Sequence, residues 1–134
     1  MGGHKGGCII IHQGYYLLVY QQGSGLWGFP KGSCRDREEP RRCAVRELFE
    51  ETGMRLRYKQ LGKHIVVDRQ HYFMVCLKNR PRVRIDNSEI TDYMWASVTD
   101  CRESTTGKTT HRVMDIVLPR MRADLQIVSE AHCF

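Results

Sequence analysis

Short apolar runs separated by polar turns dominate the first part of the chain. Residues 8–11 and 15–20 are apolar runs of strand length, and the polar segment 12–14 between them ends in glycine. Two such runs around a short glycine-bearing turn are typical of a β-hairpin. Trp27 and Phe29 follow after a polar loop, and we expect both aromatic side chains in the core.

Residues 40–52 change to a helical period. Pro40 suits the first helical position, where no N–H donor is needed, and Gly53 suits the left-handed residue that ends a helix, so we predict a helix between them. At about 100° per residue, the apolar face comprises Ala44, Val45, Leu48, Phe49 and Thr52. The opposite face comprises Cys43, Arg46, Glu47, Glu50 and Glu51. The apolar face should pack on the core, with the charged face pointing away from it.

The charged face of this helix concentrates Glu47, Glu50 and Glu51. Like charges at helical spacing destabilise a helix by roughly 0.2–0.5 kcal/mol per pair. Mg²⁺ or Mn²⁺ would remove that conflict, because hard divalent cations prefer carboxylate oxygen ligands. Arg46 is placed to pair with Glu50 one turn further on and to orient it. The alternative is a solvated acidic face that binds nothing.

Beyond the helix, apolar runs predict a mostly β segment and a closing helix. The expected elements are strands at residues 56–61, 64–68, 72–77 and 92–96, a helical turn at 98–102 and a helix at 109–117. The last helix would turn Val113, Ile116 and Val117 inward and place Arg112 and Arg120 on a basic outer face.

The length and composition are those of one globular domain. A chain of 134 residues with 41% hydrophobic and 27% charged residues can bury a core of its own. We therefore expect a single domain over residues 1–134, with a flexible lead at 1–6 and a flexible tail at 126–134. The sequence contains no run of eighteen apolar residues, so we expect no membrane span.

The cysteines and the N-terminus bear on localisation. The six cysteines show no CxxC spacing, and the N-terminus lacks the apolar region of a signal peptide. We therefore expect reduced thiols in a cytoplasmic or nuclear protein that is not secreted.

The charge balance is basic despite the acidic helix face. The net charge is +6 and the pI is about 9.1, so an anionic substrate would be steered toward the protein. Arg35, Arg37, Arg41 and Arg42 flank the start of the helix and could form a basic rim there. A basic surface that only aids solubility is the alternative.

The segment 32–54 resembles the signature of the Nudix hydrolases, G-x5-E-x7-R-E-U-x-E-E-x-G-U, in which U is a bulky apolar residue. The fixed positions are filled by Gly32, Glu38, Arg46, Glu47, Leu48, Glu50, Glu51, Gly53 and Met54. The resemblance implies an α+β fold, an αβα sandwich with a mixed central sheet. It also implies a divalent metal, Mg²⁺ or Mn²⁺, and hydrolysis of a phosphoanhydride in a nucleoside diphosphate linked to another moiety.

The resemblance also assigns roles to individual residues. Glu47, Glu50 and Glu51 would hold the metal, together with the main-chain carbonyl beside Gly32. The catalytic group would comprise Glu47, Glu51 and Glu89. Glu89 is included because it stands just ahead of an apolar-Trp strand, where many Nudix enzymes place a metal ligand or a base. The general base is Glu51 or Glu89, and the sequence does not separate them.

The other charged residues near the signature have supporting roles. We expect Glu38 to brace the loop and Arg46 to orient the carboxylates. Lys31 directly precedes the glycine that opens the acidic site, where it could contact a phosphate oxygen. The expected substrate-binding residues are Lys31, Arg35, Arg37 and Arg42.

The substrate is less well determined than the reaction. The stretch WGFPKG before the signature, the helix start and Glu89 ahead of Trp95 look most like the Nudix domain of mRNA-decapping enzymes, which implies capped RNA as substrate and RNA binding. The alternatives are dinucleoside polyphosphates, diphosphoinositol polyphosphates or nucleoside triphosphates. A catalytically inactive RNA-binding module is an alternative of another class. The oligomeric state cannot be read from the sequence.

Overall fold

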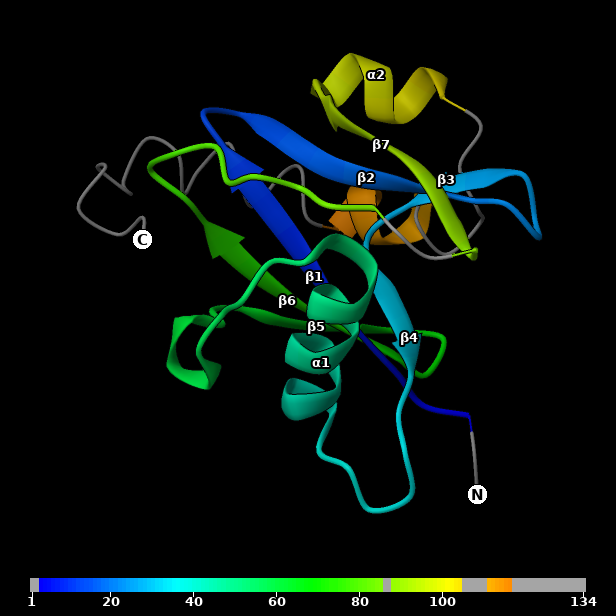
Figure 1. Ribbon diagram of the computed structural model, residues 1–134, viewed down its shortest axis with the longest axis vertical. Coiled ribbons are helices and arrows are strands. Elements are labelled where there is room, and N and C mark those ends of the chain that lie inside the picture. Colours follow the sequence, from blue (N-terminus) through cyan, green and yellow to red (C-terminus); the bar gives the residue numbers. More distant parts are fainter. Residues whose placement is uncertain (1–2, 86–87, 105–110, 117–134) are drawn as a thin grey trace.

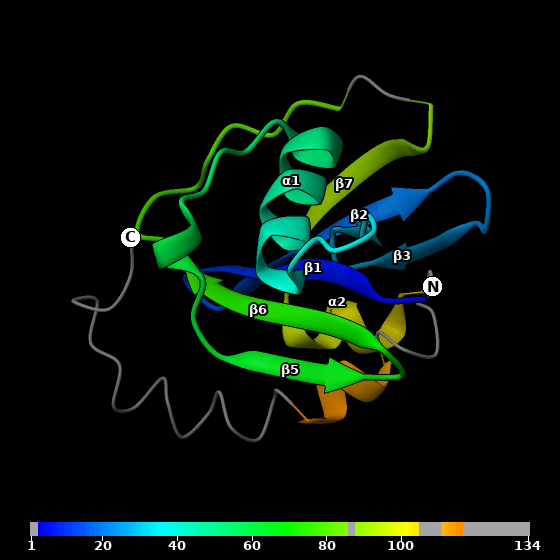
Figure 2. The ribbon, with the colours of Figure 1, turned by 90° about the horizontal axis from the view of Figure 1, so that it is seen from below.

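Two helical layers enclose a seven-stranded sheet. The computed structural model describes residues 3–85, 88–104 and 111–116. Helix α1 (Pro40–Thr52) covers one face of the sheet, whereas α2 (Val98–Glu103) and the helical residues 111–116 cover the other (Figures 1 and 2). The expected αβα sandwich is therefore confirmed.

The sheet is mixed, as expected. Its strands are β1 (Lys5–His12), β2 (Tyr15–Gln21), β3 (Leu26–Gly28), β4 (Lys31–Ser33), β5 (His64–Val67), β6 (Gln70–Cys76) and β7 (Ile90–Ala96). The main order is β3-β2-β1-β6-β5, while β4 pairs with β1 and β7 pairs with β2. The pairing of β1 with β6 is parallel and the other pairings are antiparallel.

Strand β1 is central because it is buried on both faces. Cys8 and Ile10 pack in the cluster under α1, whereas Ile9 and Ile11 pack in the cluster under α2. Successive side chains of a strand point to opposite faces, so an unbroken apolar run is what a two-sided strand requires. The core therefore consists of two apolar layers divided by this sheet.

The pairing of β1 with β4 places the residues of the candidate site next to α1. Its first residues pair with β4 and its last two pair with β2, so β4 lies beside the start of β1. A Cβ at Gly6 would come within 2.7 Å of the Pro40 carbonyl and 2.9 Å of the Ala44 amide nitrogen. Glycine at this position thus allows the first turn of α1 to pack directly on β1, which places Lys31 and Gly32 beside the helix.

The bounds of α1 agree with the prediction. The helix begins at Pro40, and Gly53 ends it in the left-handed conformation at φ 74° with its N–H bonded to the Phe49 carbonyl. The predicted apolar face is wrong for Phe49, which is 41% exposed with the Arg55 guanidinium 4.3 Å from its ring centroid. The side toward the sheet is centred on Ala44, Leu48, Glu51 and Thr52, so Phe49 lies at the flank. The prediction that Cys43 and Glu51 point away from the core is also wrong, because both are buried.

Several other predictions need correction. The strand expected at 56–61 is absent, because Tyr58–Gln60 forms a single 3₁₀ turn, η1, closed by the Arg57 N–H bonding to Gln60 Oε1 at 2.8 Å. Strand β1 starts at Lys5, so residues 5 and 6 of the expected flexible lead are paired in the sheet. In the closing helix Val113 is buried as predicted, but Ile116 is 37% exposed.

The cysteine and membrane predictions have mixed outcomes. Cys8, Cys34, Cys43 and Cys101 are free thiols, but Cys76 is disulfide-bonded, so the expectation of reduced cysteines is wrong there. Among the described residues, no helix is long and apolar enough to cross a membrane. The tail predicted at 126–134 and the inward placement of Val117 lie outside the described residues.

Candidate active site

The deepest acidic group of the site is the carboxylate of Glu51. This residue sits in the last turn of α1 and is only 6% exposed. Its Oε1 accepts a hydrogen bond of 2.8 Å from the main-chain N–H of Lys31 on β4. The helix and the strand therefore fix this carboxylate between them.

Gly32 leaves room for the carboxylate of Glu47. A Cβ built on Gly32 would overlap the Glu47 carboxyl group, so any side chain at position 32 would displace that group. Glu47 is largely buried, with a side chain 14% exposed. The backbone of Gly32 and the Glu47 carboxylate are thus in direct contact, which places the expected main-chain ligand beside an expected carboxylate ligand.

Arg46 donates hydrogen bonds to three of the four glutamates of the signature. Its Nε and Nη2 each donate to a carboxylate oxygen of Glu38 at 2.8 Å. Its Nη1 donates to Glu47 at 2.9 Å and to Glu50 at 3.1 Å, and Nη2 reaches the Ser33 carbonyl at 3.0 Å. The hydrogen bonds from Arg46 hold the pKa of Glu38 at about 2. This arrangement fits the bracing and orienting roles expected of Glu38 and Arg46.

The site carries more negative charge than its burial favours. Burial, helped by the charges of Glu47 and Glu89 and opposed by the hydrogen bond from Lys31, raises the pKa of Glu51 to about 8. Burial also raises the pKa of Glu47, although Arg46 opposes this shift. Glu89 is exposed just before β7, and its charge acts on both carboxylates. The charge of Glu89 thus acts on the carboxylates of α1, and its role as a ligand or base stays a prediction.

This donor set suits a hard divalent cation. Glu47, Glu50 and Glu51 lie within one turn of α1, with Glu51 on its buried side and Glu50 exposed, and together they offer six carboxylate oxygens. Buried like charges are unfavourable unless they are paired or bind a metal. Mg²⁺ and Mn²⁺ prefer oxygen ligands of this type. The residues therefore fit the metal predicted from the sequence.

Lys31 is half-buried beside the carboxylates. Its Nζ donates to Gln70 Oε1 at 2.6 Å, and the same oxygen accepts the Tyr72 hydroxyl at 2.8 Å. Burial and the charge of Lys5 lower the pKa of Lys31 to about 8, while Glu51 opposes that shift. Gln70 and Tyr72 were not predicted, because the parallel pairing that brings β6 beside β1 leaves no signal in the local sequence.

The predicted substrate-binding arginines take different positions. Arg35 is exposed, and its Nη2 lies 4.0 Å from Glu50 Oε1. Arg37 is also exposed, with a positive φ of 63°. Arg42 lies 5.2 Å from the ring centroid of Tyr58 on the η1 side of α1. Of these three arginines, Arg35 is the one that lies within ion-pair distance of a carboxylate on α1.

Two local sequence similarities fall on curated proteins. A 37-residue stretch is 56% identical to the RNA pyrophosphohydrolase of Bartonella bacilliformis, covering 28% of this chain and 22% of that protein. A 27-residue stretch is 63% identical to the m7GpppN-mRNA hydrolase dcap-2 of Caenorhabditis elegans, covering 20% of this chain and 3% of that protein. Both similarities are therefore local, and each spans well under two thirds of the relative.

The whole fold is similar to solved structures. A C. elegans Ap4A hydrolase binary complex superposes with a TM-score of 0.71 at 20% sequence identity, covering 92% of this chain and 99% of that one. At this identity the likeness concerns the fold alone. The NUDIX domain profile matches residues 4–115, which include the sheet, both helical layers and the complete signature. The chain therefore belongs to the Nudix family.

Proposed function

We propose that this chain hydrolyses a phosphoanhydride in a nucleoside diphosphate linked to another moiety, using divalent cations held by Glu47, Glu50 and Glu51. The observation that carries the proposal is the cluster of carboxylates on one side of α1, with Glu51 buried against β4. A solvated acidic face would not bury a carboxylate among others, because that arrangement is costly without a bound cation. Family membership supports the same chemistry.

The residues would divide the work as follows. A bound Mg²⁺ or Mn²⁺ would supply charge neutralisation at the phosphates and a more acidic water. The Gly32 carbonyl would join Glu47, Glu50 and Glu51 as a ligand, and Arg46 would hold Glu47 and Glu50 in place.

The general base has two candidates with different environments. Glu51 is buried and fixed by the Lys31 N–H, whereas Glu89 is exposed and stands on the segment leading into β7. A fixed carboxylate suits a ligand, and an exposed one can approach a substrate water more freely. Glu51 and Glu89 are therefore the two candidates for the residue that removes the proton from the attacking water.

Replacing Lys31 with alanine is expected to raise KM or lower kcat by about 10-fold while leaving metal affinity unchanged. The variant keeps the main-chain N–H that binds Glu51 and loses only the ammonium group that would meet a substrate phosphate. Steady-state kinetics at several metal concentrations measure both effects. Lys59→Ala on η1 is the matched control and should behave as wild type. Unchanged kinetics for Lys31→Ala would remove the phosphate-binding role.

For the substrate we favour the 5′ cap of RNA. The curated relatives with local similarity are named for RNA pyrophosphate and cap hydrolysis, and the net charge of +6 suits a polyanion. These similarities cover only a small part of each relative, so the proposal of an RNA substrate depends on features of this chain itself.

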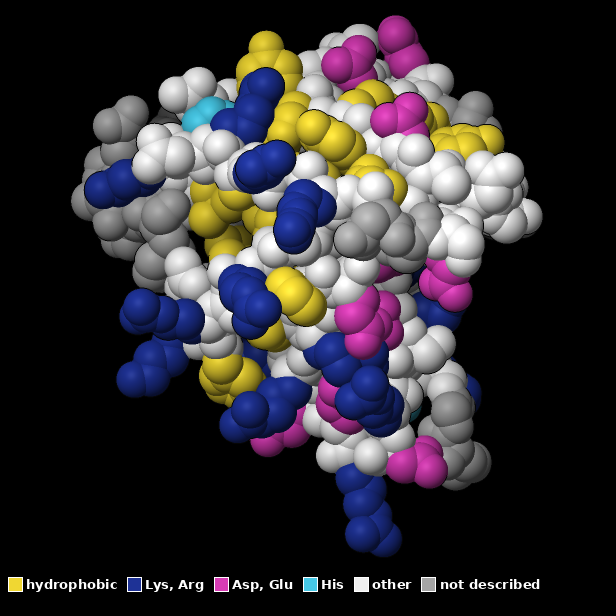
Figure 3. All heavy atoms as spheres, in the orientation of Figure 1, with side chains coloured by type: hydrophobic (Ala, Val, Ile, Leu, Met, Phe, Trp, Pro, Cys, Tyr) yellow, Lys and Arg dark blue, Asp and Glu magenta, His cyan; other side chains and the backbone are white. Residues whose placement is uncertain are grey.

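A surface of arginines and aromatic rings lies beside α1 and supports an RNA substrate. Arg80 lies 5.4 Å from the ring centroid of Trp95 and 5.8 Å from that of Tyr15, and Arg55 covers Phe49. Figure 3 shows Lys and Arg side chains spread over this face, with hydrophobic side chains among them. We call Tyr15, Phe49, Arg55, Arg80, Arg84 and Trp95 the basic-aromatic surface.

The basic-aromatic surface reaches the end of the acidic helix. The main-chain N–H of Arg84 donates to the Thr52 carbonyl at 2.8 Å, so the arginine-rich loop is attached to the last turn of α1. Tyr15 is 42% exposed and Phe49 is 41% exposed, so each ring keeps accessible area beside the arginine that lies over it. Positive charge along a backbone path with aromatic platforms is the usual composition of a single-stranded RNA site. An RNA whose cap lies at the carboxylates could therefore continue across this surface.

The closing helix, whose outer face the sequence predicted to be basic, lies away from the basic-aromatic surface. Arg112 forms an ion pair with Asp68 at 2.6–2.7 Å, and residues 111–116 lie on the sheet face opposite α1 (Figure 2). Arg120 lies outside the described residues. Arg41 is also engaged, because its Nη1 donates to the Leu61 carbonyl at 2.8 Å. The RNA proposal therefore rests on the basic-aromatic surface.

Lengthening a capped RNA should raise kcat/KM for the wild-type enzyme, and raising the salt from about 50 mM to about 200 mM should remove most of that gain, because bound phosphates release counterions. The double variant Arg80→Glu with Arg84→Glu should lose the length dependence and keep its rate on a free cap dinucleotide. Kinetics over a length series at the two salt concentrations measure this.

Arg102→Glu is the matched control for that experiment, because Arg102 lies on α2 across the sheet from the basic-aromatic surface. It should retain the wild-type length dependence. Rates that do not change with RNA length would contradict the RNA proposal and favour the second candidate.

The second candidate is hydrolysis of a small polyphosphate. The observation in its favour is the fold likeness to an Ap4A hydrolase over nearly the whole of both chains. Diphosphoinositol polyphosphates and nucleoside triphosphates belong to the same class of substrate. An inactive RNA-binding module is disfavoured, because Glu47, Glu50 and Glu51 are all present.

A further inference from the structure

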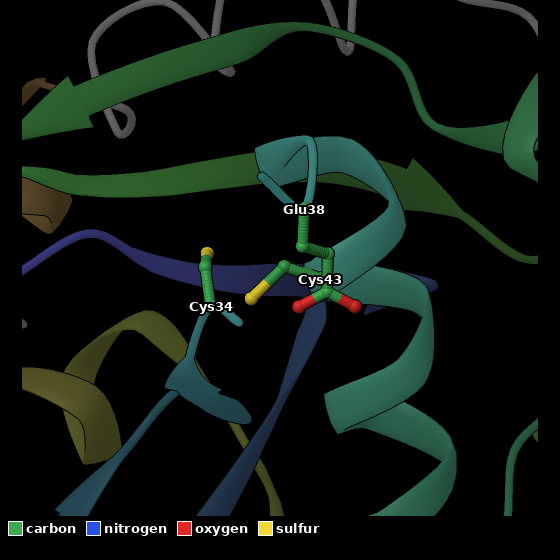
Figure 4. A group of neighbouring side chains, drawn as sticks. All are labelled: Cys34, Glu38 and Cys43. Atoms are coloured by element: carbon green, nitrogen blue, oxygen red, sulfur yellow. The ribbon is translucent and has the colours of Figure 1, made fainter. Parts of the chain in front are cut away.

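Two thiols and a carboxylate converge beside the proposed metal-binding carboxylates, where Glu38 accepts from Arg46 and Cys43 Sγ donates to the Gly32 carbonyl. Cys34 follows β4, Glu38 lies in the loop before α1, and Cys43 is in the first turn of the helix (Figure 4). One ligand atom from each residue lies within 4.8 Å of the other two. The three residues have the spacing C-x3-E-x4-C, so a single loop and helix start bring them together.

The group is reachable from solvent. An open cavity of about 550 Å³ is lined by Cys34 and Glu38, and by the imidazoles of His4 and His71. Cys34 is half-buried, and its main-chain N–H donates to the His4 carbonyl at 3.0 Å. Cys43 is fully buried behind it. An ion could thus enter from the cavity, with water available as a further ligand.

Glu38 retains a lone pair for such an ion. Within the described part of the chain, Oε1 accepts from the Arg35 N–H and from Arg46 Nη2, whereas Oε2 accepts from Arg46 Nε. A carboxylate has about four acceptor positions, so the contacts with Arg46 do not exhaust it. Arg46 would then orient the ligand from behind, as outer hydrogen-bond partners of metal ligands commonly do.

We propose that Cys34, Glu38 and Cys43 form a binding site for a thiophilic divalent cation of the Zn²⁺ class. Binding would convert both thiols to thiolates and release two protons. The resulting centre, one divalent cation with two thiolates and one carboxylate, carries a net charge of −1, which the adjacent Arg46 guanidinium offsets. Thiolate ligands select Zn²⁺ over Mg²⁺, whereas the carboxylates on α1 have the opposite preference.

Titration with Co²⁺ tests the site, because thiolate-to-cobalt charge transfer gives an absorption band that carboxylate ligands do not. The full chain, handled under nitrogen without a reductant so that the Cys76 disulfide stays intact, should show this band saturating at about one ion per chain, and Zn²⁺ should abolish it by displacement. Glu50→Gln should keep the band, because it alters only the carboxylate site. Cys34→Ser should lose the band or weaken Co²⁺ affinity by about 10-fold or more.

Cys101→Ala is the matched control, because Cys101 is a buried free thiol packed under α2 rather than α1. It should retain the band. Circular dichroism checks that the Cys34 variant is folded, and a second measurement does not need a variant at all. Zn²⁺ should slow alkylation of Cys34 in the wild-type chain by about 10-fold or more, read by mass spectrometry of the peptide.

The proposal would be overturned by the absence of a charge-transfer band in the wild-type chain, by a band of unchanged intensity and affinity in Cys34→Ser, or by alkylation of Cys34 that Zn²⁺ does not slow. Loss of the band in both Cys34→Ser and Cys101→Ala would equally reject the assignment, since the band would then not report this group of residues.

Discussion

Replacing Glu51 with glutamine is expected to lower kcat by about 10²-fold or more, with the fold intact. Glu51 is the most buried carboxylate of the site, and the Lys31 N–H fixes its Oε1. Glutamine keeps the size and an acceptor oxygen but removes the charge that would bind a divalent cation. Glu50→Gln should have a similar effect, because Glu50 belongs to the same carboxylate set.

The stability of these variants separates a metal site from a structural role. Without metal, the thermal midpoint of Glu51→Gln should equal or exceed that of the wild type, because a buried carboxylate beside Glu47 is replaced by a neutral group. Saturating Mg²⁺ or Mn²⁺ should raise the wild-type midpoint and have little effect on the variant. Glu103→Gln, an exposed position on α2, serves as the control and should match the wild type throughout. Full activity in both Glu50→Gln and Glu51→Gln would reject the assignment of the metal site.

Replacing Gly32 with alanine should lower kcat/KM by about 10²-fold, because small displacements of catalytic groups have effects of this size. The added Cβ would overlap the Glu47 carboxyl group, which is the end of a flexible side chain and can move away. The helix and strand need not shift, so the thermal midpoint should change little. The expected result is a folded protein with weakened metal binding.

Gly23→Ala is the control for this substitution, because a Cβ at Gly23 would meet nothing within 4 Å. It should match the wild type in rate and in metal affinity. Metal affinity can be followed by Mn²⁺ titration, and rates by product release. A Gly32→Ala protein with wild-type activity would show that the position of Glu47 is not critical, whereas global unfolding would show that the glycine serves packing instead.

Local rules were sufficient for the signature helix and its carboxylates. Pro40 and Gly53 fix the ends of α1 through backbone geometry alone, and helical spacing is enough to make Glu47, Glu50 and Glu51 neighbours, but it did not predict that Glu51 is buried. The contacts of Arg46 with Glu50 follow from the same spacing. These features depend on residues close together in the chain, which is why the sequence predicted them.

Features that depend on long-range pairing were not predicted. The hydrogen bond between Lys31 and Gln70 requires β1 and β6 to lie parallel, and that register is not encoded in either segment alone. The exposure of Phe49 depends on the angle at which α1 lies on the sheet, which periodicity cannot give to within one residue. The convergence of Cys34 with Cys43 depends on the path of the loop between β4 and α1.

The central claim is that the carboxylates of α1 support divalent-metal hydrolysis of a phosphoanhydride. The most direct measurement is product analysis after incubation with Mg²⁺ or Mn²⁺ and, in parallel reactions, capped RNA, free cap analogue, dinucleoside tetraphosphate and diphosphoinositol pentakisphosphate. We predict metal-dependent cleavage of a phosphoanhydride, fastest for capped RNA, which would yield a nucleoside diphosphate and a 5′-monophosphate RNA. Chelation of the metal and Glu51→Gln should both suppress it. Cleavage of none of these compounds by the metal-loaded wild-type chain, or cleavage that survives chelation and Glu51→Gln, would contradict the account.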